Sequence, residues 1–463
     1  MNRNKLLAAL ALPIILIIGV GSSFFPYKDK ALVDSSAVYN IDSLAQQTIC
    51  TGSVVLPDKT ELDGADPSFN PMPEKPHTQT LVNTTGPVIF GSLFNLNETG
   101  EEALNQSDIS YLSTASEEPK LLGTAFDTTS NTMGSAGVSS SYVNKGDLKG
   151  LAVDNCQKPE MESWIIGGNS HITSAPVLVI TNPSASSGTA SLDVYTTSSS
   201  GGPVNYSATK NISVPAFSEK RVFLSAGAPA EDGLAVHTKF YGAAMTTTVQ
   251  YSELDGITPR GIDFIKNSAA FSKEQIIPGI KIKSGPLQMN LLSLSSTNAT
   301  VEIIDSSTNE VAKSQSVDLI NGRVNVTKID GLKAGNYFAR VKSDNNIIAG
   351  ARADDAKGSE NDFAYFSSID GANNSVGLIP NNTESDIVIY GVNDGGVNDA
   401  SFVLSYYNSA GKLISQKTKQ LESGKALHIS AKELKKEKVQ YVFVNTQSLS
   451  TKLFAGQSLF MTG

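Results

Sequence analysis

The chain has 463 residues, a formal net charge of −9 and only 17% charged residues. A single hydrophobic core does not extend over so many residues, so several domains are expected. The absence of a large basic block argues against nucleic acid as a partner. Abundant Ser, Thr, Asn and Gly, with few helical patterns, predict β-strands joined by polar turns.

The first predicted element is an export segment within residues 1–27. Arg3 and Lys5 precede an uninterrupted apolar run at residues 6–20, which is typical of a signal sequence. Continued to Phe25, the run is long enough to cross a bilayer, which favours an uncleaved signal-anchor helix. The basic side then stays in the cytoplasm, and the body is extracytoplasmic. The alternatives are a cleaved signal peptide, which makes the protein secreted, and a buried core helix.

After a linker at residues 28–44, we expect an N-terminal β domain at residues 45–160. It begins and ends near Cys50 and Cys156, the only two cysteines of the chain. An exported protein meets an oxidising environment, so these two residues are predicted to form a disulfide. Two free buried thiols are the alternative. A metal site is not expected, because the chain has no C-x-x-C motif and no histidine nearby.

The only tryptophan, Trp164, follows Cys156 by eight residues. It stands where the N-terminal β domain passes into the next part of the chain. We expect it to fill the seam between these two domains, because a large aromatic side chain buries much apolar surface. A platform for a ligand is the alternative role.

The rest of the chain repeats with a period of about 100 residues, which suits tandem β-sandwiches. Each unit opens on a similar segment, namely IIGGNSHITSAPVLVITN from Ile165, IIPGIKIKSGPLQMNLLSLSS from Ile276 and GLIPNNTESDIVIYGVN from Gly377. The predicted domains are three Ig-like β-sandwich repeats at residues 161–265, 266–355 and 356–463. The fold class is therefore all-β, with tandem Ig-like sandwiches behind a signal-anchor helix.

Shared turns fix the register of the repeats. When the repeats are aligned, Gly322 and Gly424 occupy the same turn position, and apolar residues alternate with polar ones after each of them. On this register Phe223, Ile329 and Ile429 take equivalent core positions. Tyr337 is expected as a corner tyrosine of the sandwich or as an ordinary core tyrosine. Ser430 and Glu433 form a capping box that predicts one short helix.

Several segments in this order resemble an exported actinobacterial family of unknown function, domain of unknown function 5719. They are GDLKGLAVDNCQKPEMESWIIGG, VLVITNPSASSGTASLDVYTTSSSGG, ITPRGIDF and IIPGI. The family's Cys, Trp-Gly-Gly and L-x-x-x-N-P positions are here Cys156, Trp164, Gly167, Gly168, Leu178, Asn182 and Pro183. The resemblance covers most of residues 45–370. It implies an envelope location and β-rich domains, and it brings no catalytic residues.

No motif of a known enzyme class is present. The chain has no G-x-S-x-G, no H-E-x-x-H and no Walker loop. Its four histidines are His77, His171, His237 and His428, and none of them has a partner at metal-ligand spacing. We therefore expect no enzyme, no cofactor and no metal centre, with structural roles for His237 and His428.

The links between repeats are acidic and similar, and they form the one constellation that rises slightly above noise as a candidate site. Its members are Glu253, Asp255, Asp263, Asp354, Asp355, Glu360 and Asp362. Carboxylates gathered at a domain junction can hold Ca²⁺, although no loop has the D-x-D-x-D-G pattern. Solvated turns are the simpler interpretation.

Together these patterns predict a non-enzymatic protein of the cell envelope. It is expected to act as a scaffold or to bind at the extracytoplasmic surface through its β-sandwiches. The expected partner is an envelope protein or a cell-wall glycan, and the N-terminal segment contacts the membrane. A carbohydrate-active enzyme or glycan-binding module is the alternative, which a pair of carboxylates in a cleft would favour.

Overall fold

The computed structural model describes residues 43–56, 75–86, 88–97, 99–104, 109–127, 134–204, 210–357, 360–393, 399–446 and 450–461. Of the two compact units, Met1–Asp42 and Ser43–Gly463, only the second is therefore described. The expected export helix at residues 6–25 lies outside these ranges. Within them, none of the helices combines the length and the hydropathy that a membrane crossing requires.

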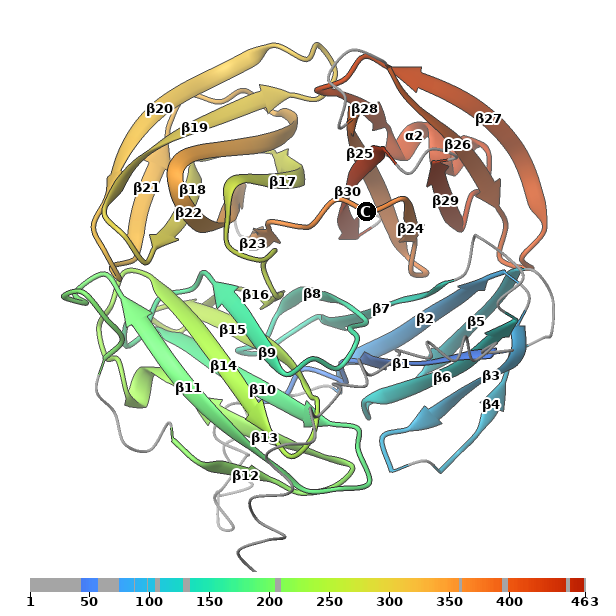
Figure 1. The fold of residues 1–463 in the computed structure, drawn as a ribbon, viewed down its shortest axis with the longest axis horizontal. Coiled ribbons are helices and arrows are strands. Elements are labelled where there is room, and N and C mark those ends of the chain that lie inside the picture. Colours follow the sequence, from blue (N-terminus) through green and yellow to red (C-terminus); the bar gives the residue numbers. More distant parts are fainter. Residues whose placement is uncertain are drawn as a thin grey trace, which may run out of the picture. The chain divides into compact units, whose positions relative to one another are not determined.

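The regular secondary structure of the described chain is almost entirely β-strand, which confirms the predicted all-β class. Its sheets group into four successive parts, which we call modules 1 to 4, at residues 43–155, 162–265, 272–367 and 374–461. Module 1 corresponds to the expected N-terminal β domain, and modules 2 to 4 to the three expected repeats. All four can be followed in Figure 1.

The first two modules have eight strands each. Module 1 contains β1 (Ser43–Cys50), β2 (His77–Thr85), β3 (Val88–Asn95), β4 (Glu102–Ala103), β5 (Ile109–Ala115), β6 (Lys120–Asp127), β7 (Gly134–Val143) and β8 (Gly150–Asn155). Module 2 contains β9 (Glu162–Ile166), β10 (Ser174–Asn182), β11 (Gly188–Thr196), β12 (Ile212–Val214), β13 (Ser218–Phe223), the 3-10 turn η3 (Leu224–Ala226), β14 (Leu234–Tyr241), β15 (Thr246–Asp255) and β16 (Thr258–Ile265).

The last two modules have seven strands each. Module 3 contains β17 (Ser272–Ile282), β18 (Leu287–Ser293), β19 (Thr297–Asp305), β20 (Val311–Leu319), β21 (Asn325–Ile329), β22 (Gly335–Lys357) and β23 (Glu360–Ser367). Module 4 contains β24 (Asn374–Leu378), β25 (Thr383–Asn393), β26 (Ala400–Tyr407), β27 (Leu413–Leu421), β28 (Lys425–Ile429), helix α2 (Ala431–Lys436), β29 (Tyr441–Thr446) and β30 (Thr451–Met461).

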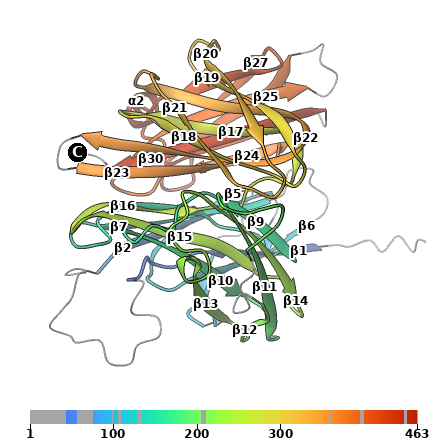
Figure 2. The ribbon, with the colours of Figure 1, turned by 90° about the vertical axis from the view of Figure 1, so that its left-hand side faces the viewer.

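Modules 1 and 2 share one strand order. In each, one sheet runs first–sixth–third–fourth and the other runs fifth–second–seventh–eighth. The two sheets of module 2, β9-β14-β11-β12 and β13-β10-β15-β16, can be followed in Figure 2. The N-terminal β domain, which the sequence analysis did not count among the repeats, therefore has the same topology as the first predicted repeat.

Module 3 keeps this order by fusing two strands into one. Residues 337–343 of β22 pair with β19 and act as the sixth strand, whereas residues 347–353 pair with β18 and act as the seventh. The eighth strand, β23, then pairs with residues 350–357 of β22. The expected domain boundary between residues 355 and 356 is wrong, because it divides this hairpin.

Module 4 has the same order without an eighth strand. Its sheets run β24-β29-β26-β27 and β28-β25-β30, so β30 takes the position of a seventh strand. In the part of the chain that the structure describes, β30 is therefore an edge strand, whereas the seventh strand of every other module is paired on both sides.

The register that the sequence predicted is present in modules 2 to 4. Phe223, Ile329 and Ile429 each end the fifth strand of their module. Ile329 and Ile429 are buried, whereas Phe223 is half-buried. Gly322 and Gly424, just before two of these strands, both have the left-handed backbone conformation that favours glycine.

Two smaller predictions are also confirmed. Tyr337 is buried, and its hydroxyl donates to the carbonyl oxygen of Lys333 at 2.9 Å, the bond of a corner tyrosine. Helix α2 begins after Ser430, whose side chain accepts the backbone N–H of Glu433.

Candidate functional site

The eighth strands of modules 1 to 3 converge on one cavity. Strand β16 contacts both β8 and β23, and β30 also contacts β8 (Figure 1). A cavity of about 500 Å³ is lined by these four strands together with parts of β7, β17 and β22. Its volume lies in the range of small-ligand sites, about 300–1,000 Å³. This cavity, which we call the central pocket, is the candidate site.

Asp263 of β16 joins three eighth strands through its carboxylate. Oδ1 accepts the backbone N–H groups of Phe264 at 2.8 Å and Val153 at 3.2 Å, and Oδ2 accepts that of Tyr365 at 2.8 Å. These donors belong to β16, β8 and β23 respectively. Burial raises the pKa of Asp263 to about 6, although Lys266 and the three amides act to lower it.

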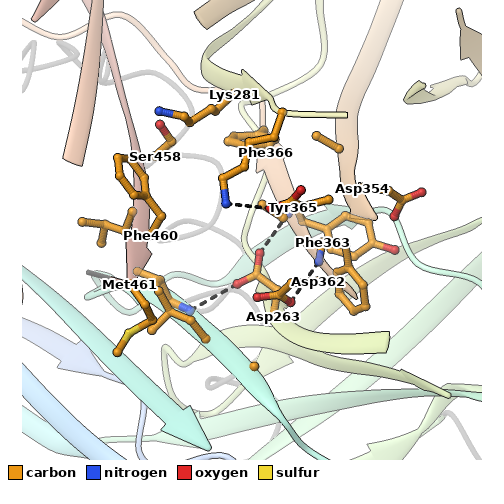
Figure 3. A pocket seen from close by; sticks show the side chains of 18 of the residues that line it. Asp263, Lys281, Asp354, Asp362, Phe363, Tyr365, Phe366, Ser458, Phe460 and Met461 are labelled. Carbon is orange, nitrogen blue, oxygen red and sulfur yellow. Dashed lines mark hydrogen bonds and ion pairs between the residues drawn. The ribbon is translucent and has the colours of Figure 1, made fainter. Parts of the chain in front are cut away.

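Asp362 of β23 is the second carboxylate of the central pocket, and its side chain lies beside that of Asp263 (Figure 3). Oδ1 accepts the N–H of Phe363 at 2.9 Å, and the backbone of Leu151 in β8 also bonds this side chain. Burial, together with the charge of Asp263, raises the pKa of Asp362 to about 7. Each carboxylate is thus tied to the backbone of a neighbouring module.

A glycine allows this close approach. A Cβ atom on Gly261 of β16 would collide with Oδ1 of Asp362 and would lie 3.2 Å from its Cα. Gly261 also has a φ of +138°, a conformation that other residues rarely adopt. The segment Gly261-Ile262-Asp263 therefore supplies both the space for one carboxylate and the second carboxylate itself.

Lysines and aromatic side chains complete the lining. Lys283 forms an ion pair with Asp355 at 2.6 Å. Lys281 forms an ion pair with Asp386 of module 4, and its Nζ lies 4.1 Å from the ring centroid of Phe460. In Figure 3, Phe460 and Met461 lie on one side of the pocket, and Phe363 and Tyr365 lie on the other. The pocket thus has charged, polar and apolar surfaces close together.

A buried ion pair forms the seam between modules 2 and 3 next to the pocket. Nη1 of Arg352 lies 2.6 Å from Oε2 of Glu253, and its Nε lies 2.8 Å from Asp354. The guanidinium also lies over the ring of Phe363, 4.4 Å from its centroid. Although burial acts to raise it, the charge of Arg352 lowers the pKa of Glu253.

The acidic junctions are therefore not solvated turns as a group. Glu253 and Asp263 are buried, and Asp354, Asp355 and Asp362 are partly buried. Asp255 alone is exposed among the junction residues whose side chains are described. No group of three His, Cys, Asp or Glu side chains in the described ranges has the arrangement of a metal site.

The predicted disulfide is present. Cys50 at the end of β1 and Cys156 just after β8 are bonded, with Cα atoms 4.1 Å apart. Gly137 of β7 packs against this disulfide, and a Cβ atom there would collide with Sγ of Cys156. The bond fastens the first strand of module 1 to the segment after its last strand.

Trp164 lies at a seam, but its partners are not those expected. Its ring stacks on His237 at 4.0 Å between centroids and meets the edge of Phe271 at 4.9 Å. The surrounding apolar cluster joins module 2 to module 3 through residues such as Ile166 and Leu292. Trp164 therefore lies at the seam between modules 2 and 3. The prediction that it lies between modules 1 and 2 is corrected.

The histidines lie apart from the central pocket. Nε2 of His237 lies 3.2 Å from Glu162, and that of His428 lies 3.3 Å from Asp386. His171 pairs with Asp232 on the surface at 3.0 Å. His77 lines a second, more polar cavity of about 1,130 Å³ between modules 1 and 4. That cavity shares Tyr142, Leu151 and Met461 with the central pocket.

The comparisons with known proteins identify a family. Residues 112–432 match the model of a family of unknown function, DUF5719. Because this range covers more than half of the chain, the chain belongs to that family. No curated protein and no solved structure matches it.

Proposed function

We propose that this member of the DUF5719 family is a non-enzymatic envelope protein that binds or holds a partner at the extracytoplasmic surface. The observation that carries the proposal is the use of both carboxylates in the central pocket. Both oxygens of Asp263 accept backbone N–H groups, and Asp362 is bonded to two more. Backbone bonds of this kind give both carboxylates a structural role in positioning strands, which favours a binding protein over an enzyme.

The location is part of the proposal. A disulfide between Cys50 and Cys156 suits an oxidising compartment outside the cytoplasm. The apolar run at residues 6–20 with its basic flank supports export, by a retained anchor or a cleaved signal, and the family resemblance suggests an actinobacterial envelope.

We also propose that the modules are tandem Ig-like sandwiches. In an Ig sandwich the second and fifth strands pair in one sheet, and the third and sixth pair in the other. The same pairs occur here, for example β10 with β13 and β11 with β14. The first and seventh strands pair differently, because β9 joins the sixth strand and β15 joins the second.

A glycan is the alternative partner. The cavity between modules 1 and 4 is lined largely by hydroxyl and amide side chains, which suit the hydroxyl groups of a sugar. If the central pocket instead cleaves a glycan, Asp362→Asn must abolish release of sugar from cell-wall material.

Affinity enrichment from intact cells tests the proposed role. The tagged full chain is compared with Ala364→Trp, which fills the central pocket from β23, and with the matched control Ala364→Ser. We expect the native chain and the serine variant to retain the same envelope component and the tryptophan variant to lose it. Tagged protein found only in the cytoplasm, or equal enrichment by all three proteins, contradicts the proposal.

A further inference from the structure

We propose that the outer edge of β30 binds an extended strand of a partner polypeptide. The partner strand takes the eighth-strand position of module 4, which β8, β16 and β23 take in the other modules. This inference rests on the proposed binding role and names the class of its partner.

The free edge follows from the hydrogen-bond pattern of β30. Leu453 exchanges two backbone hydrogen bonds of 2.9 Å with Ala372, so its N–H and C=O point away from β25. The pairing of β30 with β25 is regular throughout, and backbone direction alternates along a strand. The same groups of Ala455, Gln457, Leu459 and Met461 therefore also point outward.

No strand in the described part of the chain pairs with these four residues on that side. An edge with open N–H and C=O groups is a template for another strand. Peptide recognition by strand addition uses such an edge, with main-chain bonds for affinity and side-chain pockets for specificity. Residues 457–461 line the central pocket, so this edge borders a cavity of about 500 Å³.

The other modules indicate what fits there. Each seventh strand is covered by an antiparallel eighth strand, in which an aspartate lies opposite Ser139, Tyr251 or Asp355. These aspartates are Asp154, Asp263 and Asp362. An occupant of the β30 edge would continue the existing interface of three eighth strands, so an extended polypeptide is the occupant that the fold itself specifies.

The charged and apolar residues beside the β30 edge indicate which side chains the partner strand should carry. Lys266 lies near Asp154 and Asp263, and Lys283 lies near Asp362, so the resident aspartates have cationic neighbours. Lys149 lines the same pocket and has no carboxylate at ion-pair distance among the described residues. Phe460 and Met461 supply apolar contacts beside the edge. The partner strand is therefore expected to carry an acidic residue flanked by apolar ones.

A peptide copied from β16 provides the probe. Fluorescein-labelled RGIDFIKN, the sequence of residues 260–267, is titrated with the full chain in mild detergent, and its anisotropy is followed. We expect saturable binding. The control peptide RPIDFPKN lacks the N–H groups of the positions of Gly261 and Ile265, which face the seventh strand as that of Asp263 does, and it should bind at least tenfold more weakly. The peptide RGINFIKN, which lacks the charge, should bind with intermediate affinity.

A matched pair of variants locates the site. Leu459→Pro and Leu459→Ala both lose the leucine side chain, but only the proline removes the outward N–H. We expect at least tenfold weaker peptide binding by the proline variant than by the alanine variant. Because a proline inside the strand can also impair folding, the comparison is repeated with Met461→Pro and Met461→Ala at the strand end, and melting temperatures are compared.

Three results would overturn the inference. They are the absence of saturable binding, equal binding of RGIDFIKN and RPIDFPKN, and self-association of the chain that Leu459→Pro abolishes, which would make a second copy the occupant. If an envelope component is still enriched while the peptide does not bind, only the strand inference fails. If the peptide binds but no envelope component is enriched, only the proposed location and role fail.

Discussion

Arg352 and Glu253 form an ion pair across the seam between modules 3 and 2, with 2.6 Å between Nη1 and Oε2. Only 5% of the arginine side chain and 11% of the glutamate side chain are exposed. Because neither group is well hydrated, the loss of one partner leaves a buried charge that is only partly compensated. This pair therefore adds a charged contact to the seam, beside the apolar cluster of Ile166 and Leu292 and the bond between Tyr365 and Asp263.

We expect Glu253→Gln to lower the free energy of unfolding by about 3–5 kcal/mol, the cost of breaking a buried pair from one side. This loss is measured by urea denaturation monitored through the fluorescence of Trp164, because Trp164 lies at the same seam. Glu302→Gln is the matched control within module 3. Its partner Arg340 is more exposed, and we expect a loss of about 0–1 kcal/mol. Equal effects of the two substitutions would contradict this interpretation.

The central pocket makes stability depend on pH. The pKa of Asp263 is raised to about 6 and that of Asp362 to about 7, against about 4 in an unfolded chain. Between about pH 4 and 7 the folded state therefore binds more protons than the unfolded chain does. Its free energy of unfolding falls as the pH rises through this range. Glu253, whose pKa is lowered, has the opposite effect as pH falls below its unfolded value.

Urea unfolding at pH values from 4.5 to 8 checks this dependence. We expect Asp263→Asn to be less stable overall, because its amide group donates where the carboxylate accepts. Its stability should nevertheless change less between pH 4.5 and 7 than that of the native chain. An unchanged pH dependence would show that Asp263 does not titrate in this range.

The disulfide of module 1 should contribute strongly to stability. Cys50 and Cys156 are 106 residues apart in sequence, and closing a loop of this size contributes about 4–5 kcal/mol in the chain-entropy model. We expect the double variant Cys50→Ala/Cys156→Ala to lose about this amount in urea denaturation. Gly137→Ala should destabilise the oxidised protein because its methyl group collides with Cys156. Rapid alkylation of both cysteines in the native, unreduced protein would rule out the bond.

Two substitutions in module 4 compare a fully buried core position with a partly buried one. Ile389 is fully buried in β25, whereas Leu427 on the neighbouring β28 only packs against the same core. We expect Ile389→Ala to cost about 2–5 kcal/mol and Leu427→Ala to cost less. Thermal unfolding followed by circular dichroism gives both values. A larger loss for Leu427→Ala would place the core of module 4 elsewhere.

The sequence predicted strands and turns well where the pattern is local. The alternation after Gly322 and Gly424 placed Ile329 and Ile429 at the ends of equivalent strands. The corner bond of Tyr337 and the cap at Ser430 were also predicted, because each depends on residues only a few positions away. The disulfide was predicted because no third cysteine competes for either partner.

The sequence did not predict contacts that depend on the association of modules. Module 1 has a long undescribed stretch after β1 and was not recognised as a copy of the same topology. The hairpin of β22 and β23 was divided, because the acidic residues near 355 resembled a linker. Asp263 and Asp362 were noticed only as members of acidic segments. Their burial comes from neighbouring modules, which one strand's pattern cannot reveal.

Residue-resolved hydrogen exchange along β30 tests the open eighth-strand position most directly. The amides of Phe454, Gly456, Ser458 and Phe460 face β25, whereas those of Gln457, Leu459 and Met461 face outward. We predict slow exchange for the first set and much faster exchange for the second, with no such alternation in β7 or β15, which are paired on both sides. Equally slow exchange of both sets in the isolated protein would show that a strand already covers β30, and it would contradict the account.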